Sequence, residues 1–283
     1  MLSLRNQRIG KQTAQKLCSA FVKCQALKYL CLDLESNQIG ISGAPQLGSS
    51  LSKCINLQEI NLGLSNNKIR DKGPIGLGLQ LVNSKSLQTL VLDISKNKMR
   101  DVGLIGLIQS LSLCENLTSL TLNLVHNKIT TSGFVSLCQA LINYKKLVTL
   151  QLFIKFFKIN DEEITDIGSA FVNCKNLQNL TLELKYNQIK IQGLNNLGSF
   201  LQKCELLSTV KLNLFKNQIK YTQIQNFFNI LRSFKSVSVI EIDLRQYQAD
   251  YSFFDLKIQK NIFQKAMKKL QKCQRLVKFT ILS

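Results

Sequence analysis

The side chains that could perform chemistry are few in this chain, and most stand apart from one another. The single histidine, His126, has no evident nucleophile as a partner and no cysteine close in sequence. Acidic residues cluster once, at Asp161, Glu162, Glu163 and Asp166. Carboxylates near a helix N-terminus stabilise its unpaired N–H groups, so capping is their simplest role. The sequence therefore predicts no catalytic residues, no enzyme and no cofactor.

Nine cysteines could in principle bind a metal or form disulfides. No CxxC pair occurs, which argues against a metal site. Most of them recur at one position of a thirty-residue repeat, and the last of these follows a nine-residue insertion: Cys24, Cys54, Cys114, Cys174, Cys204 and Cys273. Equivalent positions in stacked repeats lie too far apart for the roughly 4.4–6.8 Å between Cα atoms that a disulfide needs. We expect small buried thiols in a reducing cytoplasm.

The formal net charge of +20 over 283 residues has two interpretations. The charge could serve an acidic partner, such as nucleic acid, an anionic membrane or an acidic protein. Alternatively it reflects a compositional bias, because lysines far outnumber arginines and occur beside many Asn, Gln and Ile residues. Both interpretations remain open at the level of the sequence.

A thirty-residue repeat must position any site that the chain contains. One unit runs from Leu87 to Asn116, and its first leucine or a close substitute recurs at Leu27, Leu57, Leu87, Leu117, Leu147, Leu177, Leu207 and Val237. Within the unit, the alternation of Leu90, Leu92 and Ile94 predicts a strand with one buried face. The helical spacing of Leu104, Leu107, Ile108 and Leu111 then predicts an amphipathic helix.

Stacking of these units predicts the architecture. One unit cannot bury both of its apolar faces, so neighbouring units must place strands in parallel on one side and helices on the other. Helices need more width than the roughly 4.8 Å between strands, so the stack must bend with the sheet inside. The predicted fold class is α/β: a curved solenoid, or horseshoe, with parallel strands on the concave face, helices on the convex face and about eight to nine 30-residue repeats.

Asparagine recurs just after each strand, at Asn37, Asn67, Asn97, Asn127, Asn187 and Asn217. A buried amide can satisfy backbone donors and acceptors at a tight turn, so this ladder is structural. The pattern LxxLxLxLxxNxI followed by GxxxLxxxLxxC resembles leucine-rich repeats of the ribonuclease-inhibitor type, and segments such as LTLNLVHNKI resemble tandem arrays of ciliate proteins. The resemblance implies a leucine-rich-repeat solenoid. Inhibition of basic ribonucleases would follow by analogy alone, and the positive charge argues against it.

We expect one domain over residues 1–283, with a partial repeat at 1–26, seven regular repeats at 27–236 and a divergent repeat at 237–283 that holds an insertion and a final strand. The chain begins inside a strand and ends in another, which favours a segment of a longer protein or a minimally capped array. Tyr251, Phe253, Phe254 and an amphipathic last helix with Ile262, Ala266 and Leu270 are expected to close the core. Neither a membrane span nor a secretory signal is evident.

Repeat five departs from the pattern, because Phe157 replaces the ladder Asn and Glu163 replaces the repeat glycine. One interpretation is a degenerate repeat in which Phe157 packs inward. The other is a binding hot spot, since aromatic residues and the histidine share strand or turn positions nearby: Phe153, Phe156, His126, Tyr186 and Phe215.

Charges divide by position in the repeat. Strand positions on the predicted concave face are mixed, whereas the turn after each strand carries a basic rim of Lys68, Arg70, Lys96, Lys98, Arg100, Lys128, Lys158, Lys190, Lys216 and Lys220. We also expect lysines of the last helix to extend this positive charge. A basic rim could follow a phosphate backbone, but few aromatic residues alternate with its lysines as stacking platforms.

The leading hypothesis is a non-catalytic, cytoplasmic scaffold that holds an acidic protein partner, cytoskeletal or ciliary if the ciliate resemblance is correct. The concave sheet and the rim would supply the partner-binding residues Phe153, Phe156, Tyr186, His126, Phe215, Lys98, Lys128 and Lys158. The alternatives are sequence-nonspecific RNA binding through the rim and a regulatory module of a GTPase, since some repeat proteins of this type activate GTPases. No membrane partner is expected.

Overall fold

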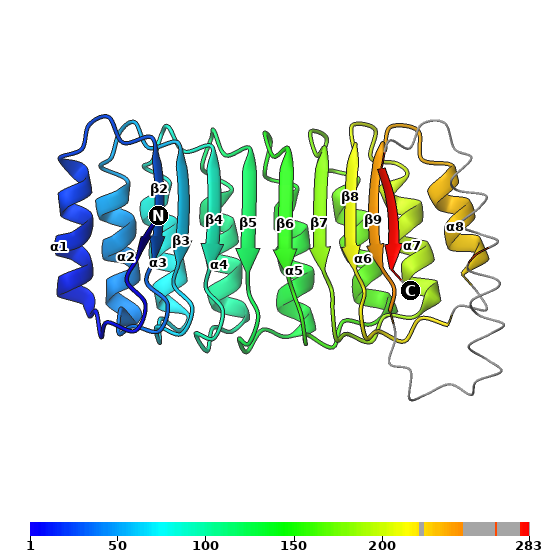
Figure 1. Cartoon of the computed structure of the whole chain (residues 1–283), viewed down its shortest axis with the longest axis horizontal. Coiled ribbons are helices and arrows are strands. Elements are labelled where there is room, and N and C mark those ends of the chain that lie inside the picture. Colours follow the sequence, from blue (N-terminus) through cyan, green and yellow to red (C-terminus); the bar gives the residue numbers. More distant parts are fainter. Residues whose placement is uncertain (221–223, 246–263, 265–277, 283) are drawn as a thin grey trace. The chain divides into compact units, whose positions relative to one another are not determined.

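Strands and helices alternate along the chain as the leucine spacing predicts (Figure 1). The computed structural model describes residues 1–220, 224–245, 264 and 278–282, which belong to two compact units, residues 1–153 and 154–283. The organisation as one domain stays a prediction. The stretch with Tyr251, Phe253 and Phe254 and the expected last helix lie outside the described residues.

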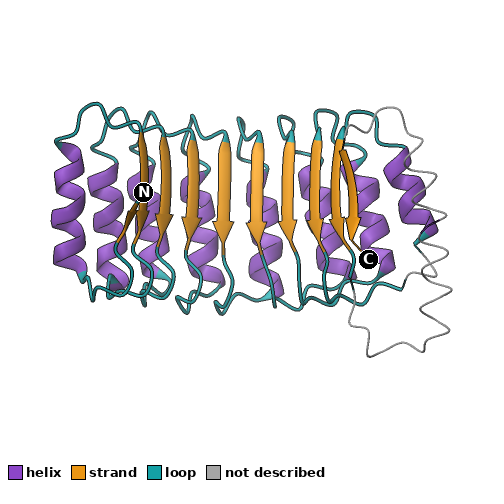
Figure 2. Cartoon of the chain, viewed as in Figure 1, coloured by secondary structure: helices purple, strands orange, loops and turns teal. Residues whose placement is uncertain are grey.

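The first unit repeats a strand followed by a helix. Its strands are β1 (Leu2–Ser3), β2 (Tyr29–Asp33), β3 (Glu59–Gly63), β4 (Thr89–Asp93), β5 (Ser119–Asn123) and β6 (Thr149–Phe153). Its helices are α1 (Lys11–Val22), α2 (Gly40–Leu51), α3 (Lys72–Leu81), α4 (Asp101–Leu111) and α5 (Thr131–Leu141). Consecutive strands pair in parallel at an offset of one repeat, as Leu62 with Leu92 and Leu92 with Leu122. The helices cover one face of this sheet (Figure 2).

The second unit continues the same alternation. Its elements are α6 (Asp161–Phe171), β7 (Asn179–Glu183), α7 (Ile191–Leu201), β8 (Thr209–Asn213), α8 (Gln225–Arg232), β9 (Val239–Asp243) and β10 (Lys278–Leu282). Strands β7 to β10 pair in parallel in chain order. Residue Lys278 pairs with Val239, which is nine residues beyond the usual offset. The two units therefore confirm the α/β class, with parallel strands on one side and helices on the other.

The core lies between the sheet and the helices. Leu90, Leu92 and Ile94 are fully buried, as are Leu104 and Leu107 of α4. The intervening residues of β4 are partly exposed on the side away from the helices, which we call the strand face. Burying each apolar side chain of this size stabilises the fold by about 1.5–3 kcal/mol, so the repeated leucines hold the stack together.

The asparagine ladder joins neighbouring repeats. Asn97 is fully buried, and its Oδ1 accepts hydrogen bonds from the backbone N–H groups of Asn67 and Ile69 at 2.9 and 3.3 Å. Its Nδ2 donates to three backbone carbonyl oxygens, those of Leu64, Ile94 and Ser95, at 2.8, 3.1 and 2.9 Å. The predicted structural role of the ladder is confirmed at this position. Phe157, which interrupts the ladder, is also buried, and its N–H donates to Asn187 Oδ1 at 3.0 Å.

Helices α3 and α4 approach closely at Gly103. A Cβ atom at this residue would lie 2.8 Å from the Cα of Asp71 and 2.7 Å from the Cγ of Met99. The Cα of Asp71 is backbone and cannot rotate away. We expect Gly103→Ala to lower the free energy of unfolding of the first unit by about 1–3 kcal/mol, the usual cost of overpacking.

Urea unfolding followed by circular dichroism measures this effect. Gly40→Asn is the matched control, because Gly40 has a φ of +70° that asparagine tolerates and no atom within 4 Å of its added Cβ. Equal midpoints for Gly103→Ala and the wild type would show that α3 and α4 can separate without cost.

Candidate partner-binding site

In the turns after β1 to β8, the residue immediately before the ladder position lies in the left-handed region of φ, and some of these turns hold further left-handed residues, such as Lys68, Lys98 and Lys158. The residues immediately before the ladder position are Asn6, Ser36, Asn66, Lys96, His126, Phe156, Tyr186 and Lys216. The left-handed conformation costs a residue with a side chain roughly 1–2 kcal/mol, and asparagine tolerates it best. Phe156 and Tyr186, with φ of 66° and 58°, are therefore unusual occupants of this position.

Three aromatic side chains of the second unit meet at this turn, and we call them the aromatic cluster: Phe156, Tyr186 and Phe215. The rings of Phe156 and Tyr186 are stacked, with centroids 4.5 Å apart and planes 19° apart. The ring of Phe215 meets Tyr186 edge to face at 5.8 Å. Phe156 is 51% exposed and Tyr186 38% exposed. The structure thus brings together three of the residues that the sequence nominated.

Two cations contact the aromatic cluster. Lys216 Nζ lies 5.1 Å from the ring centroid of Tyr186 and 5.6 Å from that of Phe215. The guanidinium of Arg245 lies 5.5 Å from the centroid of Phe215. Cations within about 6 Å of a ring centroid are attracted by its electron-rich face. Arg245 was outside the nominated site, because sequence alone cannot show that its side chain covers the ring of the preceding repeat.

Ion pairs hold most charges on the strand face of the second unit. Glu183 lies 3.7 Å from Lys155 and 3.9 Å from Lys185, so two ammonium groups share one carboxylate. Lys211 pairs with Glu241 at 3.0 Å. The mixed charge predicted for the strand positions is present here, and much of it is neutralised locally.

Arg245 is held by Asp243 as well as by the ring. Its Nε and Nη2 donate to the two carboxylate oxygens at 3.0 and 2.8 Å. These hydrogen bonds, and the attraction of the two charges, raise the pKa of Arg245 above its already high ordinary value. The guanidinium is therefore a fixed positive charge beside the cluster.

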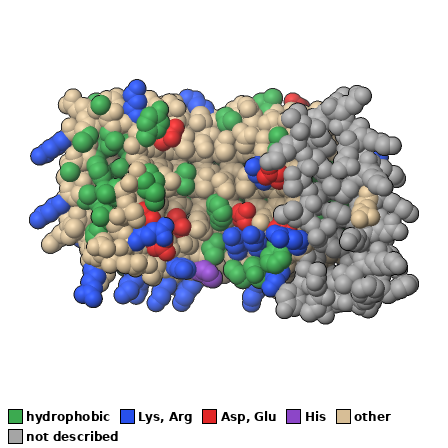
Figure 3. All heavy atoms as spheres, viewed as in Figure 1, with side chains coloured by type: hydrophobic (Ala, Val, Ile, Leu, Met, Phe, Trp, Pro, Cys, Tyr) green, Lys and Arg blue, Asp and Glu red, His purple; other side chains and the backbone are tan. Residues whose placement is uncertain are grey.

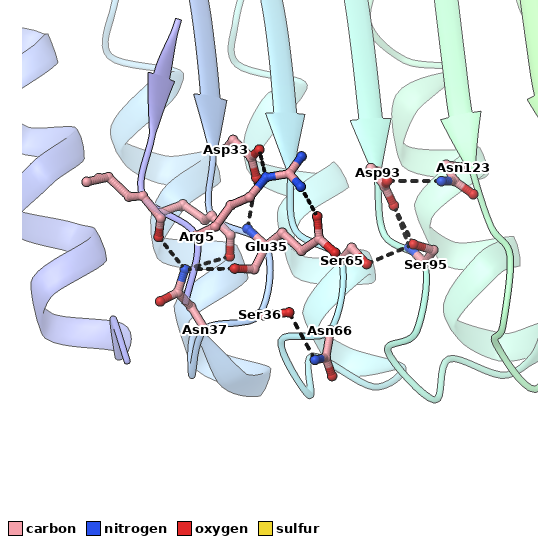
Figure 4. A network of polar contacts seen from close by, with 12 residues as sticks. Arg5, Asp33, Glu35, Ser36, Asn37, Ser65, Asn66, Asp93, Ser95 and Asn123 are labelled. Carbon is pink, nitrogen blue, oxygen red and sulfur yellow. Dashed lines mark hydrogen bonds and ion pairs between the residues drawn. The ribbon is translucent and has the colours of Figure 1, made fainter. Parts of the chain in front are cut away.

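The strand face of the first unit is more acidic. Arg5 contacts the carboxylates of Asp33 and Glu35, as shown in Figure 4. Asp93 accepts hydrogen bonds from Ser95 Oγ at 2.7 Å and from Asn123 Nδ2 at 2.9 Å. These hydrogen bonds stabilise the ends of the strands without lowering the negative charge, so this surface differs in sign from the rim beside it.

Phe153 and His126 belong to the first unit. Phe153 ends β6 on the strand face, opposite Asn123, and is half-buried. His126 is exposed at the left-handed turn position, with a φ of 57°. The expectation that they join the aromatic cluster stays a prediction.

The basic rim of the first unit is exposed and largely without carboxylate partners. Lys68, Arg70, Lys96, Lys98 and Lys128 are exposed, and among the described residues none of them forms an ion pair. Arg100 pairs with Asp71 at 3.5 Å. Figure 3 shows Lys and Arg side chains along the lower edge of the view, where the strands of Figure 1 end. In the second unit, Lys158 is likewise exposed and has no ion pair within the described ranges.

A second basic edge lies at the opposite turns of the first unit, where helices lead into strands. Lys53, Lys85, Lys145 and Lys146 are exposed there. This edge was not predicted from the sequence, although lysine recurs shortly before the first leucine of several repeats. Positive charge on both edges fits a compositional bias as well as a binding surface, so a test must compare the two edges directly.

Of the four acidic residues expected to cap α6, Glu163 does so together with Asn160, whereas Asp166 lies beyond the first turn of the helix. Asn160 Oδ1 accepts from the N–H of Glu162 at 2.7 Å, and Glu163 Oε2 accepts from the N–H of Asn160 at 2.9 Å. Asp161 instead accepts from the N–H of Lys190 in the next repeat, at 2.7 Å. Within the described ranges, no three His, Cys, Asp or Glu side chains are placed to hold a metal ion together.

Among the described residues, the repeated cysteines are buried with one exception, and Cys273 lies outside the described residues. Cys54, Cys114, Cys174 and Cys204 are buried as predicted, whereas Cys24 is exposed. The prediction was wrong for Cys24, which lies in the turn after α1 and is exposed there. Burial raises the pKa of the Cys114 thiol to about 11 and that of Cys174 to about 12. Such thiols stay protonated at neutral pH and are poor nucleophiles.

Comparisons with known proteins concern the repeats. Residues 86–107 and 116–138 match a family model described as Leucine Rich repeat. No curated protein matches the chain. Among the described residues, no helix has both the length and the apolar character needed to cross a membrane.

Three solved structures that resemble the chain are 15–21% identical to it. Actin-binding site 2 of leiomodin-1 is 15% identical with a TM-score of 0.40, over 49% of this chain and 78% of that one. Internalin C2 from Listeria monocytogenes is 21% identical with a TM-score of 0.47, over 85% and 79% of the two chains. The Rad7 and Elc1 complex in yeast is 17% identical with a TM-score of 0.46, over 84% and 64%. None of these similarities assigns a partner to this chain.

Proposed function

We propose that this chain of leucine-rich repeats is a non-catalytic scaffold for an acidic protein partner, bound through the strand face and the basic rim. Leucine-rich repeats generally mediate protein–protein interactions. The partner-binding residues would be Phe153, Phe156, Tyr186, His126, Phe215, Lys98, Lys128 and Lys158. A reducing cytoplasm would suit the buried thiols, and a cytoskeletal or ciliary partner remains part of this proposal.

The exposed rim without carboxylate partners is the observation that carries this proposal. Lysines on the strand face of the second unit are paired with Glu183 and Glu241, whereas Lys98 and Lys128 have no ion pair in the described part of the chain. Charges that are neutralised locally add little to association, while an unpaired row steers and holds an oppositely charged surface. The rim is therefore the better candidate for a long-range contact with an acidic protein.

Reversing charges on the rim is expected to abolish partner capture, and reversing the same number on the other edge is not. The rim variant is Lys98→Glu with Lys128→Glu, and its matched control is Lys53→Glu with Lys85→Glu. Both change net charge equally and alter exposed side chains of the first unit. Proteins retained from the native cell at moderate salt by the wild type, the rim variant and the control are compared by quantitative mass spectrometry.

The expected result is a small set of acidic proteins that the wild type and the control retain and the rim variant loses. Loss with both variants alike would mean that net charge alone governs binding, as the compositional interpretation holds. Retention by all three would contradict a role for the rim.

The same rim also supports the alternative function, RNA binding, because a row of cations without carboxylate partners can contact the phosphates of a nucleic acid. Filter binding of polyuridine between 50 and 200 mM salt tests this second candidate, since each phosphate contact adds to the steepness of the salt dependence, by about 0.7 per contact for a single strand. Tight binding that the rim variant loses and the control keeps would favour RNA over a protein partner.

A further inference from the structure

The turns after β3 and β4 lie side by side on the basic rim of the first unit. Asn97 of the second turn joins them, because its Oδ1 accepts hydrogen bonds from the backbone N–H groups of Asn67 and Ile69 in the first. Lys68 lies between these two residues, and Lys98 follows Asn97 at the equivalent position of the next repeat. Both lysines are exposed, so two neighbouring turns each present an ammonium group to solvent.

The backbone of Lys98 differs from that of the equivalent lysine in the next repeat. Lys98 lies in the left-handed region, with a φ of 58°, whereas Lys128 does not. The N–H of Lys128 donates to the carbonyl oxygen of Met99 at 2.7 Å. The corresponding carbonyl oxygen for Lys98 is that of Ile69, which instead accepts from the N–H of Gly73 near the start of α3, at 3.1 Å. In the described part of the chain, the N–H of Lys98 therefore has no acceptor.

Lys68 has a free N–H of the same kind. Its φ is 56°, and neither its N–H nor its ammonium group has a partner among the described residues. Arg70 and Lys96 beside it are exposed and likewise form no ion pair within the described ranges. Asp71 does not neutralise them, because it pairs with an arginine of the next repeat. We call Lys68 and Lys98, with their side chains and free N–H groups, the lysine pair.

The conformation of the lysine pair is strained. A left-handed backbone is unfavourable for residues with a side chain, and only glycine, asparagine and aspartate adopt it readily. Asn66, two residues before Lys68, is left-handed in the same turn and shows that the chain can place asparagine at such a position. Strained backbone at an exposed position with unpaired donors favours a role in binding over a purely structural one.

An acidic surface borders the lysine pair and limits the shape of its ligand. Glu59 of β3 is exposed on the strand face. Asp93 at the end of β4 keeps its negative charge while it accepts hydrogen bonds from neighbouring side chains. A long polyanion that spread from the rim onto this face would be repelled by these carboxylates. The lysine pair therefore suits a compact anion that stays on the rim.

A phosphate group on a protein side chain fits these donors best. It carries a charge of about −1.5 to −2 at pH 7 and three acceptor oxygens, so it can accept from ammonium and N–H groups together. Lysine binds phosphate as a point charge, whereas a carboxylate is best held by the two parallel donors of an arginine. Single-stranded nucleic acid is usually held by stacking on aromatic residues as well, and residues 66–70 and 96–100 include none.

We infer that the lysine pair binds a phosphorylated serine or threonine side chain of the protein partner. The phosphate lies between Lys68 and Lys98, accepts hydrogen bonds from their N–H groups and pairs with their ammonium groups. Arg70 and Lys96 attract acidic residues that flank the phosphorylated one. Phosphorylation of the partner then switches its binding on. This inference rests on the proposed scaffold function and deepens it, because it assigns the acidic partner a phosphate and a position on the rim.

An array of short synthetic peptides with random sequences around a central phosphoserine tests the inference without knowledge of the native partner. The peptide that binds the full chain most tightly is then made in three forms. They contain phosphoserine, serine, or two consecutive glutamates that match the charge of the phosphate. Fluorescence anisotropy at physiological salt measures the affinity of each form.

Two double variants locate the binding. Lys68→Asn with Lys98→Asn removes both ammonium groups, and asparagine suits the left-handed turns, so this variant should fold. The matched control is Lys53→Asn with Lys85→Asn, which removes the same charge from exposed positions on the opposite edge of the first unit.

We expect the phosphoserine form to bind at least about tenfold more tightly than the serine and glutamate forms, because only the phosphate offers acceptors to all the donors of the lysine pair. The variant of the lysine pair should lose at least about tenfold in affinity for the phosphoserine form. The control should lose less than about threefold, since charges farther away are screened by salt.

Four results would overturn the inference. They are the failure of every phosphoserine peptide to bind, equal affinity of the glutamate form, equal losses for the two double variants, and tighter binding of polyuridine that the variant of the lysine pair loses.

Phosphatase treatment of the cell extract before capture separates this inference from the scaffold function. Rim-dependent capture that survives the treatment would reject the phosphate and leave the scaffold function intact, whereas capture that the treatment abolishes would support both. Absence of any rim-dependent capture would reject the scaffold function, and selective binding of the phosphoserine peptide would then still support the lysine pair as a phosphate site.

Discussion

Replacing Asn97 with alanine is expected to lower the free energy of unfolding of the first unit by about 2–4 kcal/mol, because several buried backbone groups lose their partners at once. The amide of Asn97 contacts two backbone N–H groups and three backbone carbonyl oxygens from two repeats. No side chain of the same shape without polar atoms can satisfy them, and the site is fully buried.

The effect of Asn97→Ala should be local, because repeats interact mainly with their neighbours. Hydrogen exchange measured by mass spectrometry is expected to show faster exchange in β3, β4 and the turns that follow them. Asn61→Ala is the control, since Asn61 is exposed on β3, and surface changes of this kind usually stay within about 0.5 kcal/mol. An unchanged urea midpoint together with unchanged hydrogen exchange would contradict a stabilising role of the Asn97 amide.

Raising the pH from 9 to 11 is expected to destabilise the fold by several kcal/mol. Burial raises the pKa of Cys18 and Cys174 to about 12 and that of Cys114 and Cys204 to about 11, from an ordinary value of 9.0. Tyr144, whose hydroxyl donates to the carbonyl of Ile108 at 2.8 Å, has its pKa raised well above 10.0 by burial. All of these groups are neutral when protonated, so the folded state retains protons that the unfolded chain releases.

The sign follows from this difference in proton binding. Below pH 9 both states are protonated and the stability from these groups is fully present. As the pH rises through 9 toward the folded pKa values, the unfolded state loses protons first. This ionisation stabilises the unfolded state relative to the folded state. Each fully shifted group then removes up to about 1.4 kcal/mol of stability per pH unit.

Urea unfolding at pH 8, 9, 10 and 11 measures this loss, and two cysteine variants assign it. Cys174→Ala should reduce the slope of stability against pH, because its buried thiol titrates only in the unfolded state. Cys204→Ala should also reduce the slope, because burial raises the pKa of Cys204 to about 11. Identical slopes for the wild type and Cys174→Ala would show that the buried thiols do not govern alkaline unfolding.

The rim and the aromatic cluster would make different contributions to recognition. Exposed lysines such as Lys98 and Lys128 would act at long range, and salt would weaken their attraction over a Debye length of about 8 Å at physiological ionic strength. Phe156 and Tyr186 would act only on contact, through burial of apolar surface. A partner that uses both would associate quickly through the rim and dissociate slowly because of the cluster.

Periodicity made much of the fold predictable from the sequence. Leucines at a fixed spacing require every repeat to adopt the same strand and helix, and burial of one strand face fixes the parallel register because a one-residue slip would expose Leu90 and Leu92. The ladder asparagines were equally readable, since a buried amide after a strand has few roles other than satisfying backbone groups. Phe157 was recognisable as a departure for the same reason.

Individual surface features were less predictable. The exposure of Cys24 depends on which side chains cover the turn after α1, and the second basic edge with Lys53 and Lys85 depends on which turns face solvent. Neither property is visible in a single repeat. The repeat pattern placed Phe156 and Tyr186 at equivalent positions of neighbouring repeats. It could not predict the stacking of their rings or the placement of Arg245 over the ring of Phe215.

The sequence by itself therefore determined the strand–helix repeat, its parallel register and the structural ladder, because these follow from burial that recurs every thirty residues. Only the tertiary structure decided which cations are neutralised and which ring faces are covered. Those properties depend on how side chains of neighbouring repeats lie against one another. Phe156, Tyr186 and Lys216 occupy the same left-handed turn position in consecutive repeats, and their side chains contact one another in that order. The repeat builds the surface, and contacts between neighbouring repeats determine what that surface can bind.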